Sequence, residues 1–215
     1  MSGAVVIGAG PGIGRAVAQR FAREGLPVAV LARRQETVDD TAAALAPAGV
    51  PVLALAADAR DERDLRAALD AVVEAHGVPA ALVYNAALVR PDAPGELSAA
   101  EHVDAWRVNV LGAYTAAAHV ARQMAARGTG SILLTGGMPE PVAAYTSLSL
   151  GKAGLRTLAA LLHEHLGPRG VHVATVTVGG YVEPGGDYDP DDIAEHYWRL
   201  HVQRPEQWEL EVRHG

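Results

Sequence analysis

Four glycines occur within seven residues near the amino end of the chain, in the segment VVIGAGPGIGRAVA (5–18): Gly8, Gly10, Gly12 and Gly14. An apolar run precedes them and an amphipathic segment follows, so they are expected to form a strand-to-helix turn. Glycines let a pyrophosphate approach the backbone closely, and the N–H groups that open the next helix attract anions. The pattern predicts a nucleotide site; the alternative is a tight connection that binds nothing.

Two arginines follow the second expected strand, in LARR (31–34). Many dinucleotide-binding folds carry an acidic residue here, which binds both hydroxyls of the adenosine ribose. The guanidinium groups of Arg33 and Arg34 instead suit a 2′-phosphate, which favours NADP(H) over NAD(H). The alternative is a solvated arginine pair at the start of a helix.

Short apolar runs alternate with longer amphipathic segments, which predicts a parallel sheet with helices on both faces. Most of the runs are continuously apolar, as is typical of strands buried on both sides. Strands are expected at Ala4–Ile7, Pro27–Ala32, Pro51–Ala56, Ala80–Tyr84, Ser131–Thr135, Val171–Val178 and Trp208–Arg213.

Helix signals fill the gaps between these runs. Ile13–Arg23 is amphipathic, and Asp61–His76 starts at an expected N-cap, Asp61. Ser98 and Glu101 form a capping box, from which a long helix is expected to run towards Arg127. Another helix is expected to start around Asp189. No repeat or linker divides the chain, which favours one domain.

Composition excludes several classes of protein. The chain has 215 residues, 49% of them hydrophobic, enough for a sizeable core. Its formal net charge of −7 disfavours nucleic acid and anionic membranes as partners. No apolar stretch is long enough to span a bilayer, so a cytoplasmic protein is expected. The spacing of the nine histidines indicates no metal site, and no Gly-x-Ser-x-Gly elbow occurs.

The order of these motifs makes the chain resemble the short-chain dehydrogenases/reductases over residues 3–213. Gly8, Gly12 and Gly14 fit the family's Thr-Gly-x-x-x-Gly-x-Gly turn, with Ile7 in the place of Thr. Further segments match in order: YNAA (84–87), GSILLTGG (130–137), GKAGL (151–155) and VGGYVEP (178–184). The resemblance implies a single-domain, doubly wound Rossmann-type parallel sheet of about seven strands over residues 1–215.

The resemblance also implies NADP(H) as the cofactor. Arg33 and Arg34 look like the NADP-preferring branch of the family, and Asp58 occupies the place that contacts the adenine edge. The expected cofactor contacts are Gly8, Gly10, Gly12, Ile13, Gly14, Arg33, Arg34, Asp58, Asn85, Lys152, Gly180 and Val182.

The family's catalytic tetrad is matched only in part. Asn109 and Lys152 fall at its Asn and Lys positions. The family's Tyr lies four residues before the Lys, where the two side chains share a helical face and the ammonium lowers the pKa of the phenol. Leu148 occupies that position, and the Ser position falls at Gly137 or Gly136. The family's usual proton transfer cannot be carried over to this chain.

Several hydroxyl groups are candidates to replace the missing one. Tyr145 precedes Lys152 by seven residues, about 10 Å along a helix axis, so it is expected to reach the pocket only from a loop. Ser149 lies three residues before Lys152, on nearly the same face; Ser147 and Thr135 are further options. The alternative for Ser147 and Thr146 is a helix cap, and Tyr145 can equally cover the core.

The carboxyl-terminal region is short for the family. The segment EPGGDYDPDD (183–192) replaces a larger lid and leads into a helix that carries Tyr197 and Trp198. Together with Trp208, these rings are expected to pack the last helix against the last strand. The alternative is that Tyr197 and Trp198 line a substrate site with Tyr181 and Tyr188. The resemblance further implies a homodimer or homotetramer, paired through alanine-rich faces of 98–127 and 152–166.

Three functions are consistent with this pattern. The first is an NADP(H)-dependent reductase of a carbonyl or enone, or the reverse oxidation of an alcohol, with a non-standard proton donor. The second is a non-redox enzyme in the same pocket, an isomerase, dehydratase or cyclase, active without cofactor turnover. The third is a non-catalytic NADP(H)-binding regulator, which binds both redox forms without turnover.

Overall fold

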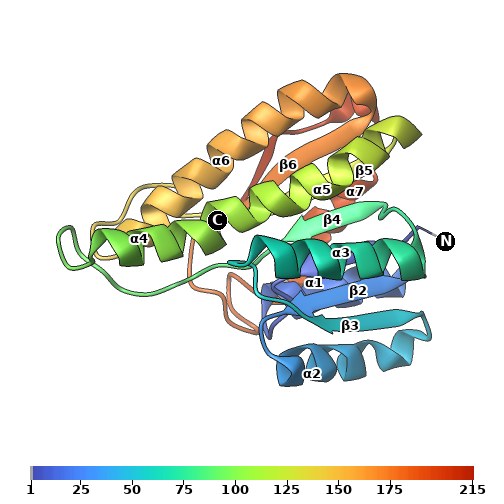
Figure 1. Cartoon of the computed structure of the whole chain (residues 1–215), viewed down its shortest axis with the longest axis horizontal. Helices are drawn as coiled ribbons and strands as arrows, with labels where there is room; N and C mark the ends of the chain where they lie inside the picture. The colour runs from blue at the N-terminus through green and yellow to red at the C-terminus, as the bar shows by residue number, and fades with distance from the viewer. Residues whose placement is uncertain (1) are drawn as a thin grey trace.

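The computed structural model describes residues 2–215 and contains one seven-stranded sheet (Figure 1). The strand order is β3-β2-β1-β4-β5-β6-β7, and every neighbouring pair is parallel. The strands are β1 (Ala4–Ile7), β2 (Val28–Ala32), β3 (Val52–Ala56), β4 (Ala81–Tyr84), β5 (Gly130–Gly137), β6 (Val171–Val178) and β7 (Glu211–His214). The expected doubly wound sheet is confirmed.

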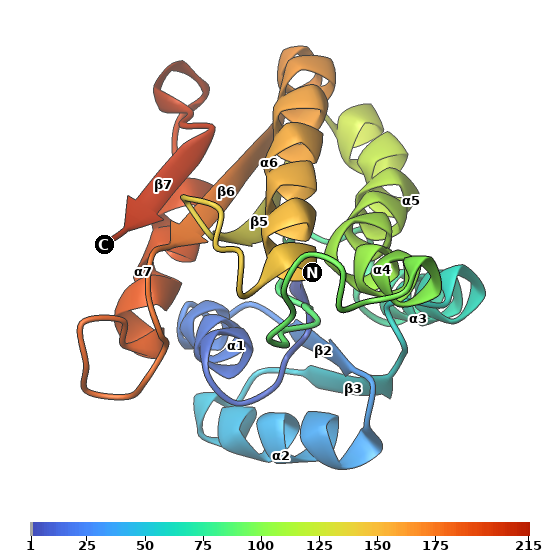
Figure 2. The same ribbon diagram turned by 90° about the vertical axis from the view of Figure 1, so that its left-hand side faces the viewer.

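Helices cover both faces of the sheet (Figure 2). One apolar core lies beneath α1 (Ile13–Arg23), α2 (Gln35–Leu45) and α7 (Pro190–His201). The other core lies beneath α3 (Glu62–His76), α5 (Gly112–Arg127) and α6 (Thr146–Leu166), and α4 (Ala99–Trp106) precedes α5 at its amino end. Strands β1, β4 and β6 are buried along their whole length, as their apolar sequences predict.

The helix starts follow the capping signals. The Asp61 carboxylate accepts from the backbone N–H groups of Arg63 and Asp64, and Ser98 and Glu101 form the reciprocal capping box. Asp189 accepts from the N–H of Asp191 at the start of α7. The expected long helix from Ser98 is not continuous, because five residues of π-helix, Arg107–Leu111, separate α4 from α5.

The last strand is shorter than expected. It covers Glu211–His214 instead of Trp208–Arg213, because a 3₁₀ turn at Pro205–Gln207 and an extended link occupy the preceding residues. The indole of Trp208 stacks on the ring of His172 in β6, with centroids 4.9 Å apart. Within residues 2–215, no helix is long and apolar enough to cross a membrane.

Strands β1 and β4 are neighbours in the sheet. After β1 the next strand, β2, is added on one side of this pair, and after β4 the next strand, β5, is added on the other side. A crevice opens beyond the carboxyl ends of parallel strands at such a point. Both cavities described below lie there.

Candidate functional site

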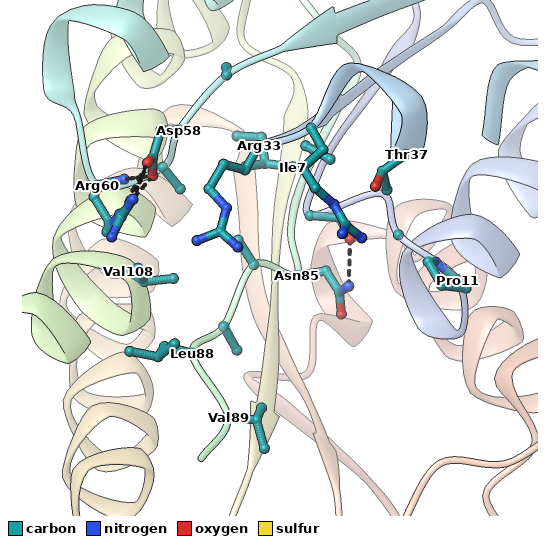
Figure 3. Close-up of a pocket in the computed structure, with 18 residues that line it drawn as sticks. Ile7, Pro11, Arg33, Thr37, Asp58, Arg60, Asn85, Leu88, Val89 and Val108 are labelled. Atoms are coloured by element: carbon teal, nitrogen blue, oxygen red, sulfur yellow. Dashed lines mark hydrogen bonds and ion pairs between the residues drawn. The ribbon is translucent and has the colours of Figure 1, made fainter. Parts of the chain in front are cut away.

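Two adjoining cavities open at the carboxyl ends of the strands. The nucleotide-side cavity, of about 450 Å³, is lined by the residues that follow β1, β2, β3 and β4 (Figure 3). The inner cavity, of about 720 Å³, is lined by the ends of β5 and β6 and the start of α6. Both cavities have Asn85, Ala87 and Val89 in their walls, so they form one continuous cleft.

The glycine turn forms one end of this cleft, and its glycines have different tasks. Gly8 and Gly10 line the nucleotide-side cavity. Gly12 is the N-cap of α1 with φ of 92°, a conformation that favours glycine. A Cβ on Gly14 would lie 2.2 Å from the Gly8 carbonyl oxygen, so this glycine lets α1 pack directly on the turn. Gly12 and Gly14 therefore shape the turn without lining either cavity.

Arg33 and Arg34 follow β2 and lie in the wall of the same cavity. The side chain of Arg33 extends into the space between the Asp58–Arg60 pair and Asn85 (Figure 3). Among the ion pairs formed within residues 2–215, none involves either arginine. Two exposed guanidinium groups without a carboxylate partner are suited to a phosphate group.

Asp58 lies across the cavity from the glycine turn, directly after β3, and Arg60 holds its carboxylate. The Arg60 guanidinium donates to both carboxylate oxygens, at 2.6 Å from Nη2 and at 3.0 and 3.1 Å from Nε. These hydrogen bonds lower the pKa of Asp58. The structure thus places Asp58 in the cleft as expected, but as the anionic half of an ion pair.

Asn85 is the centre of a hydrogen-bond chain that links the glycine turn, the loop after β4, strand β5 and helix α7. Its Nδ2 donates to the Gly8 carbonyl at 2.8 Å, and its Oδ1 accepts from the Thr135 hydroxyl at 2.9 Å. Because that hydroxyl has one hydrogen, the Tyr197 OH must be the donor in its 2.6 Å contact with Thr135. Tyr197 is fully buried, and burial raises its pKa. A side chain of α7 thus fixes the glycine turn through β5 and β4.

Lys152 lies at the base of the inner cavity. Its Nζ donates to the Thr135 carbonyl at 2.6 Å, and only 7% of the residue is exposed. Burial, and secondarily the charge of Arg156, lower its pKa to about 8. Leu148, one turn earlier on α6, lines the same cavity and is also buried. The amino group therefore has an apolar neighbour where an acid or a hydroxyl would lie.

The two glycines at the end of β5 have opposite surroundings. A Cβ on Gly136 would lie 2.3 Å from the Thr177 hydroxyl, whereas a Cβ on Gly137 would meet its nearest atom, Cε of Lys152, at 3.6 Å. Both glycines line the inner cavity, but a side chain at 137 would lie beside Lys152, whereas one at 136 would collide with Thr177 of β6. Of the two alternatives for the Ser position, Gly137 is the one at which an added side chain would have room and would lie beside Lys152.

Asn109 lies in the π-helix and lines neither cavity. Its Oδ1 accepts from the Leu88 N–H at 2.8 Å. Its side chain also packs on Gly151, where a Cβ would lie 2.6 Å from that of Asn109. Asn109 thus holds the loop after β4 against α6. Its neighbours Leu88 and Val108 line the nucleotide-side cavity, whereas Asn109 itself does not.

Of the candidate hydroxyl groups, that of Tyr145 belongs to a residue that lines the inner cavity, and that of Ser149 does not. Tyr145 is the N-cap residue of α6, with non-helical backbone, and lines the inner cavity, as the loop placement allows. Ser149 does not line it, because its hydroxyl accepts from the Val142 N–H and donates to the Val142 carbonyl. It is a loop contact and not a candidate proton donor.

The amino end of α6 is capped from a distance. Asp92, which is 1% exposed, accepts from the backbone N–H of Ser147 at 2.9 Å and from its hydroxyl at 2.8 Å. The expectation that Thr146 or Ser147 caps this helix is wrong, because both lie inside its first turn and Thr146 donates to the Ala143 carbonyl. The cap holds the loop after β4 against the start of α6, beside Tyr145.

The remaining residues expected to contact the cofactor lie in the wall of the inner cavity. Ile13, at the start of α1, and Gly180 and Val182, after β6, all line it. Tyr188 packs where a Cβ on Gly180 would lie and so holds this loop against the end of β7. Tyr197 and Trp198 pack α7 on the α1 side of the sheet instead of lining the cavity, with Trp198 edge-on to Phe21.

Several contacts of the site carry no sequence signal. Tyr197 and Asp92 bind partners 62 and 55 residues away, and Arg60 binds Asp58 from an exposed turn. Met138 lines the inner cavity with φ of 47°, unusual for a residue other than glycine, and Arg156 donates to its carbonyl. Within residues 2–215, no three His, Asp or Glu side chains lie close enough together to hold a metal ion.

The family model described as short chain dehydrogenase matches residues 2–185. Among curated proteins, cis-4-hydroxycyclohexanecarboxylate dehydrogenase of Sinomonas cyclohexanicum is 34% identical over 183 residues, which cover 82% of this chain and 72% of that protein.

Solved structures superpose over nearly the whole chain. A metagenomic short-chain oxidoreductase in complex with NADP has a TM-score of 0.90 at 28% identity and covers 100% of this chain and 97% of its own. An actinorhodin polyketide ketoreductase variant with NADPH has a TM-score of 0.91 at 26% identity, with 99% and 95% of the two chains covered.

Proposed function

Because the chain belongs to the short-chain dehydrogenase family, we propose that it is an NADP(H)-dependent oxidoreductase acting on a small carbonyl compound or enone, or on an alcohol in reverse. One observation carries this proposal. A single cleft joins two unpaired arginines at its nucleotide end to a buried lysine at its inner end.

The cleft fits a dinucleotide phosphate. A Cβ added to Gly8 would lie 2.4 Å from the backbone N of Ala86, so the turn packs directly on the loop after β4. A Cβ added to Gly10 would meet only the Thr37 methyl group, at 3.7 Å, so this side of the turn is open. Arg33 and Arg34 have the charge and geometry for the 2′-phosphate. That two of the similar solved structures hold NADP or NADPH supports the same choice.

The chain's own residues would share the work as follows. Arg33 and Arg34 bind the 2′-phosphate, and Asp58 reaches the adenine edge while Arg60 holds its carboxylate. Lys152 binds the hydroxyls of the second ribose, and the loop with Gly180 and Val182 covers the nicotinamide end. NADP(H), when bound, supplies or accepts the hydride. Asn85 keeps the glycine turn in place through its bond to the Gly8 carbonyl.

Proton transfer is the non-standard part of the proposal. Leu148 has no proton to give or accept, and Gly137 has no side chain to polarise a carbonyl. Tyr145, which lines the inner cavity, or a water molecule takes the proton-donor role. We therefore propose an atypical member of the family, slower than a member with a coupled Tyr–Lys pair.

The arginine pair gives a direct test of cofactor choice. Arg33→Ala combined with Arg34→Ala is expected to raise the Kd for NADPH about 10- to 100-fold and leave the Kd for NADH nearly unchanged, because only NADPH carries the 2′-phosphate. Fluorescence titration measures both constants. Arg122→Ala, an exposed arginine on α5, is the matched control and should change neither. An equal loss for both nucleotides would refute this role.

Turnover separates the three functions. An oxidoreductase consumes NADPH in the presence of a panel of ketones, aldehydes and enones. Conversion of a compound without NADPH consumption would indicate a non-redox enzyme, and tight binding of both redox forms with no turnover would indicate a regulator.

We also propose that the chain forms a homodimer or homotetramer through its two long helices. Large apolar side chains are exposed along α5 and α6 and the π-helix, among them Tyr114, Leu150, Leu161 and Leu111. Sedimentation velocity is expected to show an assembly that Leu161→Glu weakens. Val202→Glu, an equivalent change beyond α7, should leave it intact. A monomer at every concentration would contradict this proposal.

A further inference from the structure

The cavity around Lys152 has an unusual chemical feature. Lys152 is the only lysine in the chain; every other residue among its 18 lysines and arginines is arginine. An arginine guanidinium stays protonated in proteins, whereas a lysine amine can lose its proton and act as a nucleophile. The one side chain capable of amine chemistry is therefore buried in the wall of a cavity of about 720 Å³.

Among residues 2–215, no carboxylate pairs with this amine. Its hydrogen bond goes to the carbonyl of Thr135, which is neutral. Arg156, one turn later, carries a like charge. Glu140 and Tyr145 line the same cavity but do not bond to Nζ. Burial and like charge both favour the neutral amine.

The space in front of the amine is apolar and open. Leu148 lies one turn before Lys152, and Val89, Met138, Val142 and Val182 continue the wall. Gly137 leaves room beside Cε of Lys152, since even a Cβ there would remain 3.6 Å away. An apolar carbonyl compound can therefore approach the amine without displacing a side chain of the chain itself.

We propose that Lys152 is a carbonyl-capturing residue that forms an imine with apolar aldehydes and ketones bound in the inner cavity. The Nζ lone pair attacks the carbonyl carbon, and one proton moves from Nζ to the carbonyl oxygen to give a neutral carbinolamine. Nitrogen then loses its proton as the hydroxyl leaves as water, which forms the C=N bond. The sequence is redox-neutral: carbonyl and amine give imine and water. This activity goes beyond the proposed function and needs no nucleotide.

Reductive trapping tests the proposal directly. The nucleotide-free protein is incubated with hexanal and sodium cyanoborohydride at pH 7.5, and the reductant's hydride converts any imine into a stable secondary amine. Intact mass and peptide mapping then locate the hexyl group. We expect one group on Lys152, forming at least about tenfold faster in the folded chain than in the same chain unfolded in urea, because the folded amine is less protonated.

Controls separate this chemistry from ordinary amine labelling. The amino terminus, a second amine, is the internal reference for reagent activity in each state. Lys152→Arg replaces the amine with a guanidinium that stays protonated and should remove the label from that position, while Lys152→Met removes the ionisable group altogether. Labelling of the amino terminus alone, or labelling of Lys152 that is slower in the folded chain, would overturn the proposal. An NADPH titration of the same sample reports cofactor binding independently.

Discussion

A chain carrying both Leu148→Tyr and Gly137→Ser is expected to reduce ketones with NADPH about 10²- to 10⁴-fold faster than the unaltered chain, the range that a positioned general acid contributes. Residue 148 lies one helical turn before Lys152 and lines the inner cavity, so a phenol there lies beside the Lys152 amine, whose protonated form lowers the pKa of a phenol. Absorbance of NADPH with a panel of cyclic and open-chain ketones measures the rate.

The structure indicates that both side chains can be accommodated. A Cβ on Gly137 meets no atom closer than 3.6 Å, and Leu148 already borders a cavity large enough for a phenol. The matched control pairs Leu148→Tyr with Gly136→Ser, whose Cβ would lie 2.3 Å from the Thr177 hydroxyl. Adding Lys152→Met to the active pair should remove the gain. A folded double variant that binds NADPH and shows no acceleration would contradict the assignment of these positions.

Gly14→Ala is expected to weaken NADPH binding at least tenfold and to lower the free energy of unfolding by about 1–3 kcal/mol, as overpacking typically does. The added Cβ would lie 2.2 Å from the Gly8 carbonyl oxygen and 2.9 Å from Cα of Ala9. Both are backbone atoms of the turn, so the turn itself must move, and the phosphate cradle moves with it. Urea unfolding followed by circular dichroism, together with NADPH titration, measures the two effects.

The neighbouring Gly10→Ala is the matched control for stability. Its Cβ would meet only the Thr37 methyl group at 3.7 Å, an ordinary contact, so the unfolding midpoint should stay close to that of the unaltered chain. If Gly14→Ala were as stable and bound NADPH as well as Gly10→Ala, the close packing of α1 on the turn would be wrong.

Features encoded within short stretches of sequence could be predicted. The continuously apolar runs identified the strands, and Asp61, Ser98 and Asp189 located three helix starts, because a cap depends on residues only two or three positions away. The structure brings the glycine turn and the arginine pair into one cavity wall, because each directly follows a strand and parallel strands end at one edge of the sheet.

Features that depend on contacts across the fold could not be predicted. Asp92 caps α6 from 55 residues away, and Tyr197 reaches Thr135 across 62. Nothing in the neighbourhood of either residue in the sequence indicates its partner. Ser149 is a case in which a local pattern misled. Its helical spacing from Lys152 indicated a hydroxyl in the inner cavity, but the hydroxyl instead accepts from the Val142 N–H and donates to the Val142 carbonyl.

The most direct test of the account is a fluorescence titration of the purified protein with NADPH and, in parallel, with NADH. The unpaired Arg33 and Arg34 predict binding of NADPH in the micromolar range and binding of NADH at least about tenfold weaker. Binding of neither nucleotide, or equal binding of both, would contradict the assignment of the cleft as an NADP(H) site.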